Sequence, residues 1–268
     1  MKVKDYFYSQ EVFDVVPSEH EGILKTLNIP ADLSKYYNSE NYISHTNNKK
    51  GLKEIIYSLI QKQNLKYKFN LIQKFSQGKK IVDYGCGNGI FLEFMKNKGY
   101  EIQGFEPSST GKIETEKRLG IKLASNFDEI NKVDVITLWH VLEHIPNPNE
   151  ILNELKNKLN DDGILVIALP NYESYDAKIY GEFWAAYDVP RHVFHYSKNG
   201  AINYFSKFFK VKTTAPLLFD SYYISLLSGN YKQNSFPFLV ALKNGFLSNQ
   251  KAKNDQNYSS VVYILTKI

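Results

Sequence analysis

Histidine side chains in two stretches of this chain have the types and spacing that proton-transfer chemistry requires. His140 and His144 lie four residues apart after an apolar run, and His192 lies in an aromatic segment. An imidazole titrates near neutral pH, so it can act as the general base for a hydroxyl, an amine or an activated carbon acid. We predict that His140 or His192 is this base. Tyr187 and Arg191 are predicted to orient the acceptor, Arg191 by pairing with a carboxylate or phosphate on it.

The same imidazoles permit a second reading, as ligands of a metal. A cluster of His140, His144, His192 and His195 would suit zinc, which imidazoles bind well. We expect no metal, because no carboxylate or thiolate is spaced along the sequence to complete such a site. The structural alternatives are that His144 bonds within its own loop, that His195 packs against its aromatic neighbours, and that the nearby Glu143 caps or pairs locally.

The rest of the chain is organised around a glycine-rich stretch, KKIVDYGCGNG at Lys79–Gly89. It is typical of a buried strand that runs into a turn and then a helix, the opening of a nucleotide-binding unit. Glu106 lies at the end of a second predicted strand and suits the two hydroxyls of a ribose. Asp83 suits an ammonium group, since opposite charges attract. The alternative is a glycine-rich turn that binds nothing.

Four segments in this order, DYGCGNG, GFEPS, VDVITLWHVLEHIPNP and LNDDGILVIALPN, resemble motifs of the class I S-adenosylmethionine (SAM)-dependent methyltransferases. The resemblance extends from about Gly78 to Pro170. It implies an α/β fold: a Rossmann-like, mostly parallel sheet of seven strands with helices on both faces and an antiparallel last strand. It also implies that SAM binds at the carboxyl ends of the first strands. The SAM-binding residues that it implies are Tyr37, His45, Asp83, Tyr84, Gly85, Cys86, Gly87, Glu106, Pro107, Asn126, Phe127, Trp139, His140 and His144.

Some of these assignments have structural alternatives. Asn126 and Phe127 fall where similar enzymes hold the adenine, but they also suit the N-terminal cap of a short helix. Tyr37 and His45 belong to a segment that can cover the SAM site in similar proteins, or that simply packs on the domain as a loop.

The chain divides into two predicted parts. Residues 1–50 form an N-terminal extension, with no cysteine between residues 1 and 85 for a zinc knuckle. Residues 51–268 form the methyltransferase domain, which starts with an amphipathic helix over 51–77. Ile121–Ser125 is predicted as the third strand. Insertions at 170–197 and 220–257 are predicted to shape the acceptor side, because long connections are usually functional.

Bulk composition narrows the partners. The 268 residues carry a net charge of +5 with lysines spread along the chain, so no basic stripe for nucleic acid is evident. The single Cys excludes an internal disulfide and fits the cytoplasm. No apolar segment of about 18 residues suggests a membrane span or a signal peptide. We expect a monomer or homodimer that binds a small molecule.

The function that fits best is SAM-dependent methyl transfer to the oxygen, nitrogen or carbon of a small molecule. Methyltransferases of this fold that act on bases in nucleic acids have a [DNS]-P-P-[YF] run or a cysteine nucleophile after the fourth strand. Here the residues after that strand are WHVL and the only Cys lies in the glycine loop, so methylation of bases is disfavoured. Two alternatives stay open. One is a NAD-dependent dehydrogenase of Rossmann type, and the other is a SAM-binding protein without catalysis.

Overall fold

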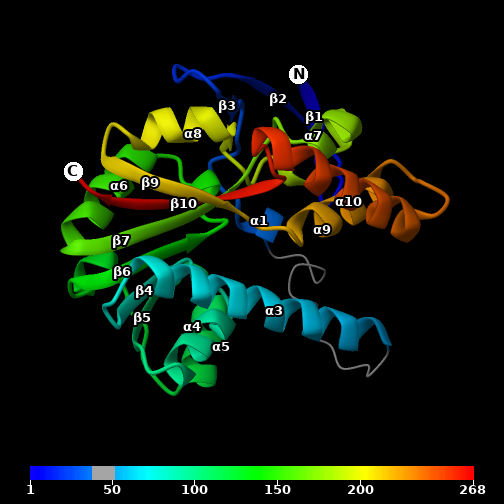
Figure 1. Cartoon of the computed structure of the whole chain (residues 1–268). Coiled ribbons are helices and arrows are strands. Elements are labelled where there is room, and N and C mark those ends of the chain that lie inside the picture. Colours follow the sequence, from blue (N-terminus) through cyan, green and yellow to red (C-terminus); the bar gives the residue numbers. More distant parts are fainter. Residues whose placement is uncertain (38–51) are drawn as a thin grey trace.

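The computed structural model describes residues 1–37 and 52–268, with side chains of residues 1–37 and 58–268. A sheet of six strands forms its centre (Figure 1), in the order β5-β4-β6-β7-β10-β9. The strands are β4 (Lys80–Tyr84), β5 (Glu101–Phe105), β6 (Val133–Trp139), β7 (Leu159–Pro170), β9 (Phe209–Pro216) and β10 (Ser260–Lys267). The first four are parallel, and β10 runs antiparallel to both β7 and β9. The mostly parallel Rossmann-like class and the antiparallel last strand are confirmed.

The predicted count of seven strands is wrong, since the described residues place six in this sheet. The third predicted strand, Ile121–Ser125, contributes only one bridge, from Ala124 to Phe105. Leu123 of this segment is buried beside Cys86, Leu92 and Leu119. The segment therefore serves packing between helices more than strand pairing.

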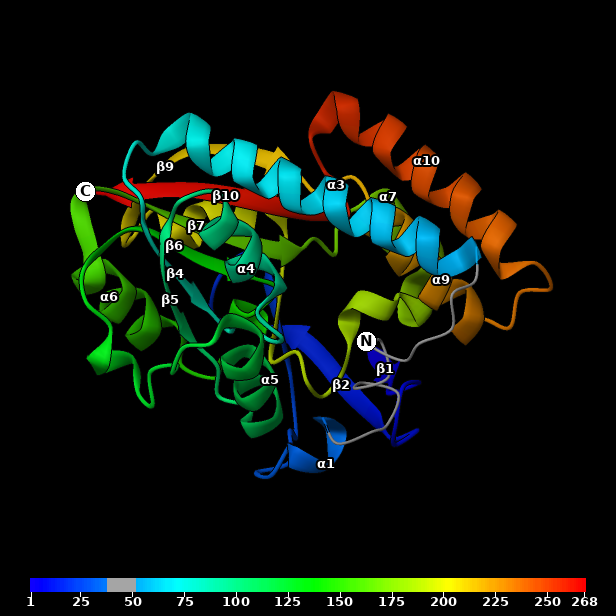
Figure 2. The same ribbon diagram turned by 90° about the horizontal axis from the view of Figure 1, so that it is seen from below.

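Alternate residues of the central strands face two separate apolar layers, as a period of two requires. Ile81 and Val135 pack with Ile72 of α3 (Leu52–Phe75) and with residues of α4 (Ile90–Asn97). Val82 and Ile136 pack on the other face, against helices α6 (Pro148–Lys158) and α8 (Lys198–Phe205). Figure 2 shows α3 along one face of the sheet, extending beyond it on the side where α9 (Asp220–Tyr231) and α10 (Pro237–Asp255) lie.

A second, small sheet joins the N-terminal segment to the insertion after β7. Its order is β1-β2-β3-β8, and β3 pairs antiparallel with β8. The strands are β1 (Lys2–Lys4), β2 (Val12–Pro17), β3 (Ile23–Thr26) and β8 (Phe194–Tyr196). The short helix α1 (Ser34–Tyr37) follows β3 along the chain. The extension and the insertion therefore form one structure, although about 170 residues separate them along the chain.

Three further helices gather at the carboxyl ends of the parallel strands. The pairing of Ser260 with Pro170, and of Val261 with Pro216, puts the start of β10 beside the ends of β7 and β9. Figure 1 shows α7, α9 and α10 at this end of the sheet, opposite the C-terminus. Their bounds are α7 (Tyr175–Tyr180), α9 (Asp220–Tyr231) and α10 (Pro237–Asp255). None of the described helices has the length and apolar character to cross a membrane.

Candidate active site

The glycine loop after β4 has backbone angles that other residues rarely adopt. Gly85, Gly87 and Gly89 have φ angles of 74°, 55° and 74°. A Cβ on Gly85 would lie 2.6 Å from a methyl carbon of Val141, so the loop also needs glycine for space. The amide groups of Gly85 and Cys86 donate to the carbonyl of Phe105, which fixes the loop to the end of β5. The strand, turn and helix that the sequence predicts are confirmed.

Glu106 lies beside this loop, as its offset along the sequence predicts. Its carboxylate accepts hydrogen bonds from the amides of Gly87 at 2.7 Å and Ser108 at 2.9 Å. The second bond comes from the N-cap residue of α5 (Ser109–Leu119). Each carboxylate oxygen keeps further lone pairs for hydroxyl donors. Pro107 follows on the surface, whereas Tyr84 is buried against the rings of Phe105 and Phe127.

Asp83 is buried at the end of β4, and the hydroxyl of Thr137 donates to it at 2.6 Å. Burial raises the pKa of Asp83 to about 7, against the opposing effects of Thr137 and of Lys68. Lys68 comes from α3, and its Nζ lies 4.1 Å from the ring centroid of Trp139. The sequence gives no sign that Lys68 lies beside the site, because a lysine in an amphipathic helix usually lies in solvent. Cys86 is buried nearby, and burial raises the pKa of its thiol, which disfavours a thiolate.

The described contacts of Asn126 and Phe127 are structural. Asn126 caps the short helix η2 (Phe127–Glu129), because its side chain accepts a hydrogen bond from the amide of Glu129. Phe127 is buried in the core, with its ring 5.1 Å from that of Tyr84. The alternative of a helix cap therefore describes Asn126 in this structure.

His140 follows β6 with a φ angle of 58° and is held between two carboxylates. Its Nε2 lies 2.9 Å from Asp220, and its Nδ1 lies 3.5 Å from Oε1 of Glu143. Burial alone would lower the pKa of His140, but Asp220 and Glu143 outweigh it and raise this pKa to about 9. The imidazole is then a cation at neutral pH, with both nitrogens facing carboxylates. This geometry does not favour His140 as the general base.

His144 and His192 lie together, with ring centroids 4.5 Å apart. Nδ1 of His144 lies 3.0 Å from the carbonyl of Arg191, and Nδ1 of His192 lies 2.9 Å from the carbonyl of Ala186. Burial lowers the pKa of His192 well below its usual value, so its imidazole is neutral at pH 7. The hydroxyl of Tyr37 lies 3.2 Å from Nδ1 of His144. His45, the other predicted residue of this segment, lies outside the described residues.

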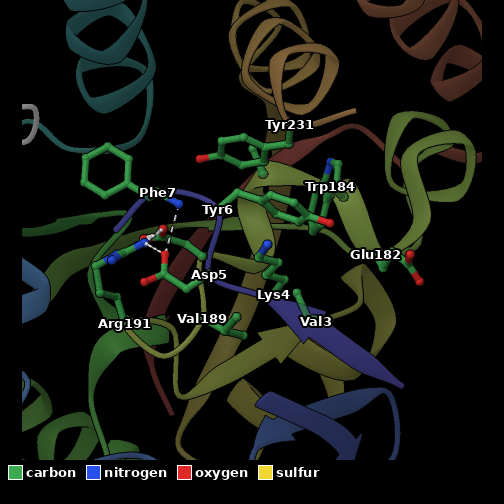
Figure 3. Close-up of a pocket in the computed structure, with 12 residues that line it drawn as sticks. Val3, Lys4, Asp5, Tyr6, Phe7, Glu182, Trp184, Val189, Arg191 and Tyr231 are labelled. Carbon is green, nitrogen blue, oxygen red and sulfur yellow. Dashed lines mark hydrogen bonds and ion pairs between the residues drawn. The ribbon is translucent and has the colours of Figure 1, made fainter. Parts of the chain in front are cut away.

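The predicted role of Arg191 in orienting the acceptor is not supported by its contacts. Arg191 is 1% exposed, and its guanidinium pairs with Asp188 at 2.5 Å and with Asp5 at 3.1 Å. It also donates to the carbonyl of Tyr36, and Figure 3 shows Phe7 above it. With its donors engaged and no exposed edge, Arg191 ties the N-terminal segment to the insertion.

Tyr187 and His195 are also buried in the insertion. Burial raises the pKa of Tyr187 to about 12, and its ring packs edge-on against Trp184 and His195. Burial lowers the pKa of His195 to about 3, and its Nε2 lies 2.9 Å from the hydroxyl of Thr26. The contacts of His195 agree with the predicted packing role, because they join β8 to β3.

Residues 60–208, more than half of the chain, match a family model described as a methyltransferase domain. A ubiquinone biosynthesis O-methyltransferase from Glaesserella parasuis serovar 5 is 32% identical over 109 residues, which are 35% of this chain and 46% of that protein. A tRNA U34 carboxymethyltransferase from Campylobacter hominis is 33% identical over 131 residues, 43% of this chain and 45% of that protein. The chain thus matches about half the length of these relatives.

Two solved structures share the fold. A coclaurine N-methyltransferase bound to N-methylheliamine and S-adenosylhomocysteine has a TM-score of 0.51 and 16% identity, covering 83% of this chain and 75% of that one. A cyclopropane synthase from Mycobacterium tuberculosis has a TM-score of 0.50 and 14% identity, covering 75% and 83%. At these identities the likeness concerns the fold alone.

Proposed function

We propose that this chain, which belongs to the methyltransferase-domain family, transfers the methyl group of SAM to a small-molecule acceptor. The observation that supports this most is the arrangement at the carboxyl ends of β4 and β5. The buried carboxylate of Asp83 lies at the end of β4, where the glycine loop begins. The carboxylate of Glu106 lies at the end of β5 and accepts a hydrogen bond from the Gly87 amide of the same loop. SAM has an ammonium group and a ribose, and these are the partners that two separate carboxylates suit. Glu106 would suit the ribose of NAD as well, but the carboxylate of Asp83 beside the loop would repel a pyrophosphate, and this disfavours the NAD-dependent dehydrogenase.

The sulfonium of SAM makes its methyl group electrophilic, so the protein mainly positions the acceptor in line with it. The proton of the acceptor leaves during or before transfer. Of the two histidines predicted as its base, His192 is neutral at pH 7, whereas His140 is a cation flanked by Asp220 and Glu143. We therefore favour His192 over His140 as the base, with Tyr187 in the wall around it.

We propose a small molecule as the acceptor, because the relatives include an O-methyltransferase of ubiquinone biosynthesis. One relative is named for a tRNA, so the assay panel includes tRNA beside phenols, catechols, amines and sugar nucleotides. Release of S-adenosylhomocysteine with a small molecule supports the proposal. Transfer to tRNA alone contradicts it, and SAM binding without transfer to any acceptor supports the non-catalytic alternative. The cytoplasmic location and the monomeric or homodimeric state remain predictions.

Binding of SAM is tested by titration calorimetry with Glu106→Gln. Loss of the charge removes a charge-assisted hydrogen bond, about 1.5–3 kcal/mol, so the Kd for SAM rises roughly 10- to 150-fold. The matched control is Glu101→Gln, an exposed carboxylate at the other end of the same strand, which leaves the Kd unchanged. Equal affinity in both variants, or binding of NAD(H) in place of SAM, would overturn the proposal.

A further inference from the structure

Glu143 is a buried carboxylate whose oxygens have no hydrogen-bond partner in the described structure. The residue is 1% exposed, and neither Oε1 nor Oε2 is bonded. The contact at 3.5 Å with Nδ1 of His140 is too long to satisfy it. Apart from this ion pair, no described residue donates a hydrogen bond to the carboxylate, and native proteins satisfy such buried groups with donors or use them to coordinate metals. Glu143 lies in the short helix η3 (Leu142–His144). The backbone carbonyl of Glu143 accepts a hydrogen bond from the amide of Val193, which fixes the position of the residue.

Two imidazoles next to Glu143 are oriented in the way that metal ligands are. His144 and His192 each direct Nδ1 to a backbone carbonyl, at 3.0 Å and 2.9 Å. A carbonyl only accepts, so Nδ1 carries the proton and Nε2 carries the lone pair. Metal-ligating histidines almost always donate their other ring N–H to a carbonyl, carboxylate or water, which fixes the tautomer and the ring.

The three side chains also lie close enough to share an ion. One carboxylate oxygen of Glu143 and one nitrogen from each of His144 and His192 lie within 4.8 Å of one another. Donors at 2.0–2.2 Å from a tetrahedral ion lie about 3.4 Å apart, so small side-chain rotations bring these three into range. From this geometry we propose that Glu143, His144 and His192 bind one divalent transition-metal ion.

The donor set narrows the kind of ion. Two imidazoles and one carboxylate suit zinc and its neighbours in the first transition row, whereas magnesium prefers oxygen ligands and waters. Three protein ligands leave at least one coordination position for a further ligand. His140 and Glu143 are in contact at 3.5 Å, so the site adjoins the carboxyl end of β6. The inference goes beyond methyl transfer and does not depend on it. A metal ion at Nε2 of His192 takes up the lone pair that a general base needs, so the base role proposed for His192 applies to the metal-free chain.

Cobalt(II) is the probe for this site, because its visible spectrum reports the number and kind of its ligands. Full-length wild-type protein is stripped with a chelator, desalted and titrated with CoCl2, and zinc content is measured after reconstitution. The expected result is one ion per chain. Glu143→Gln and His192→Asn are expected to weaken Co²⁺ binding more than about 10-fold, since even outer partners of ligands matter by 10- to 100-fold. His20→Asn is the control, because the His20 ring contacts Tyr204 and lies near Lys207 instead.

Three outcomes overturn the metal site. They are stoichiometry far below one, a Co²⁺ spectrum of hexa-aqua type, or wild-type affinity in Glu143→Gln. The last would mean that Glu143 is not a ligand of the ion. Circular dichroism checks the fold of each variant, and Glu143→Gln, of nearly equal shape, keeps the test decisive if His192→Asn unfolds. SAM binding is measured in parallel. A chain that binds Co²⁺ but not SAM refutes the methyltransferase proposal and leaves the metal site standing.

Discussion

Asp83 links cofactor binding to pH at the scale of single residues. Burial raises the pKa of Asp83 to about 7, so near neutrality a large fraction of the chains carry it protonated. The ammonium of SAM favours the ionised form, and affinity therefore rises as pH rises through this pKa. Linkage predicts that the Kd for SAM falls about 10-fold from pH 6 to pH 8. Calorimetry at several pH values measures it, and Asp83→Asn should bind weakly with a flat profile. The same slope in that variant would assign the effect to another group.

The effect of Asp83 on folding stability changes with pH in the opposite direction to its effect on SAM binding. The pKa of Asp83 is raised above its usual value of about 3.9, so the folded state holds this proton more tightly than the unfolded chain does. The contribution of Asp83 to stability is thus full below about pH 4 and is lost as pH rises toward 7. Bound SAM offsets that loss, because it places a cation beside the carboxylate.

Replacement of Gly85 by alanine should destabilise the fold more than the same change at Gly99. Gly85 and Gly99 have similar φ angles, 74° and 81°, but only at Gly85 would a Cβ clash, 2.6 Å from Val141. Alanine at either position costs about 1–2 kcal/mol for the left-handed backbone. Gly85→Ala should lose roughly 1–3 kcal/mol more for the overpacking. Unfolding in urea compares the two variants, and equal losses would show that Val141 moves aside freely.

At the scale of elements, the small sheet depends on a charge cluster between two segments. Arg191 from the insertion pairs with Asp188 and with Asp5, which lies just after β1. Burial opposes the charge of Asp188, but Arg191 outweighs it and lowers the pKa of this carboxyl. The cluster therefore stabilises the fold above the unfolded pKa of Asp, about 3.9, and the benefit disappears as pH falls.

Removing the arginine tests this connection. Arg191→Met leaves two carboxylates near each other without their cation, and breaking a buried pair in this way costs about 3–5 kcal/mol. Chemical unfolding at pH 7 measures the loss. Lys2→Met removes an exposed pair with Asp14 on the same sheet and should stay close to wild type. Equal stability of the two variants would contradict the structural role of Arg191.

Helix α3 contributes Lys68 to the carboxyl end of β4, where its charge acts on Asp83. The positive charge of Lys68 lowers the pKa of Asp83 and so opposes the effect of burial. Lys68→Met should therefore move the midpoint of the pH profile of SAM binding to higher pH. Lys66→Met is the matched control, since Lys66 lies exposed on the same helix. An unchanged midpoint in Lys68→Met would mean that Lys68 does not act on Asp83 in solution.

At the scale of the whole molecule, SAM should stabilise the fold that it binds. A ligand at 100 times its Kd adds about 2.7 kcal/mol to the folded state. For a chain of this size that corresponds to a rise in Tm of roughly 5–10 °C. Differential scanning fluorimetry with SAM and S-adenosylhomocysteine measures the shift, and NAD(H) serves as the control. A shift with NAD(H) alone would contradict the proposed cofactor.

Local sequence determined much of the fold and one edge of the candidate site. The run from Lys79 to Gly89 predicts strand, turn and helix because its β-branched residues and glycines limit the backbone residue by residue. The place of Glu106 beside the glycine loop is also predictable, because β4 and β5 are parallel neighbours and their carboxyl ends meet. The short stretch Ile121–Ser125 failed as a strand because its fate depends on the helices that bury Leu123. Strand propensity is weak where packing competes with it.

Contacts between distant residues were decided only by the tertiary structure. Asp220 reaches His140 across 80 residues, and Arg191 reaches Asp5 across 186. Glu143 and His144 are adjacent in sequence, but His192 joins them only because the insertion folds back over the end of β6. No periodicity or spacing records such contacts. They arise when the burial of apolar surface packs separate segments together, and that packing then sets the charge and the partners of every polar group it encloses.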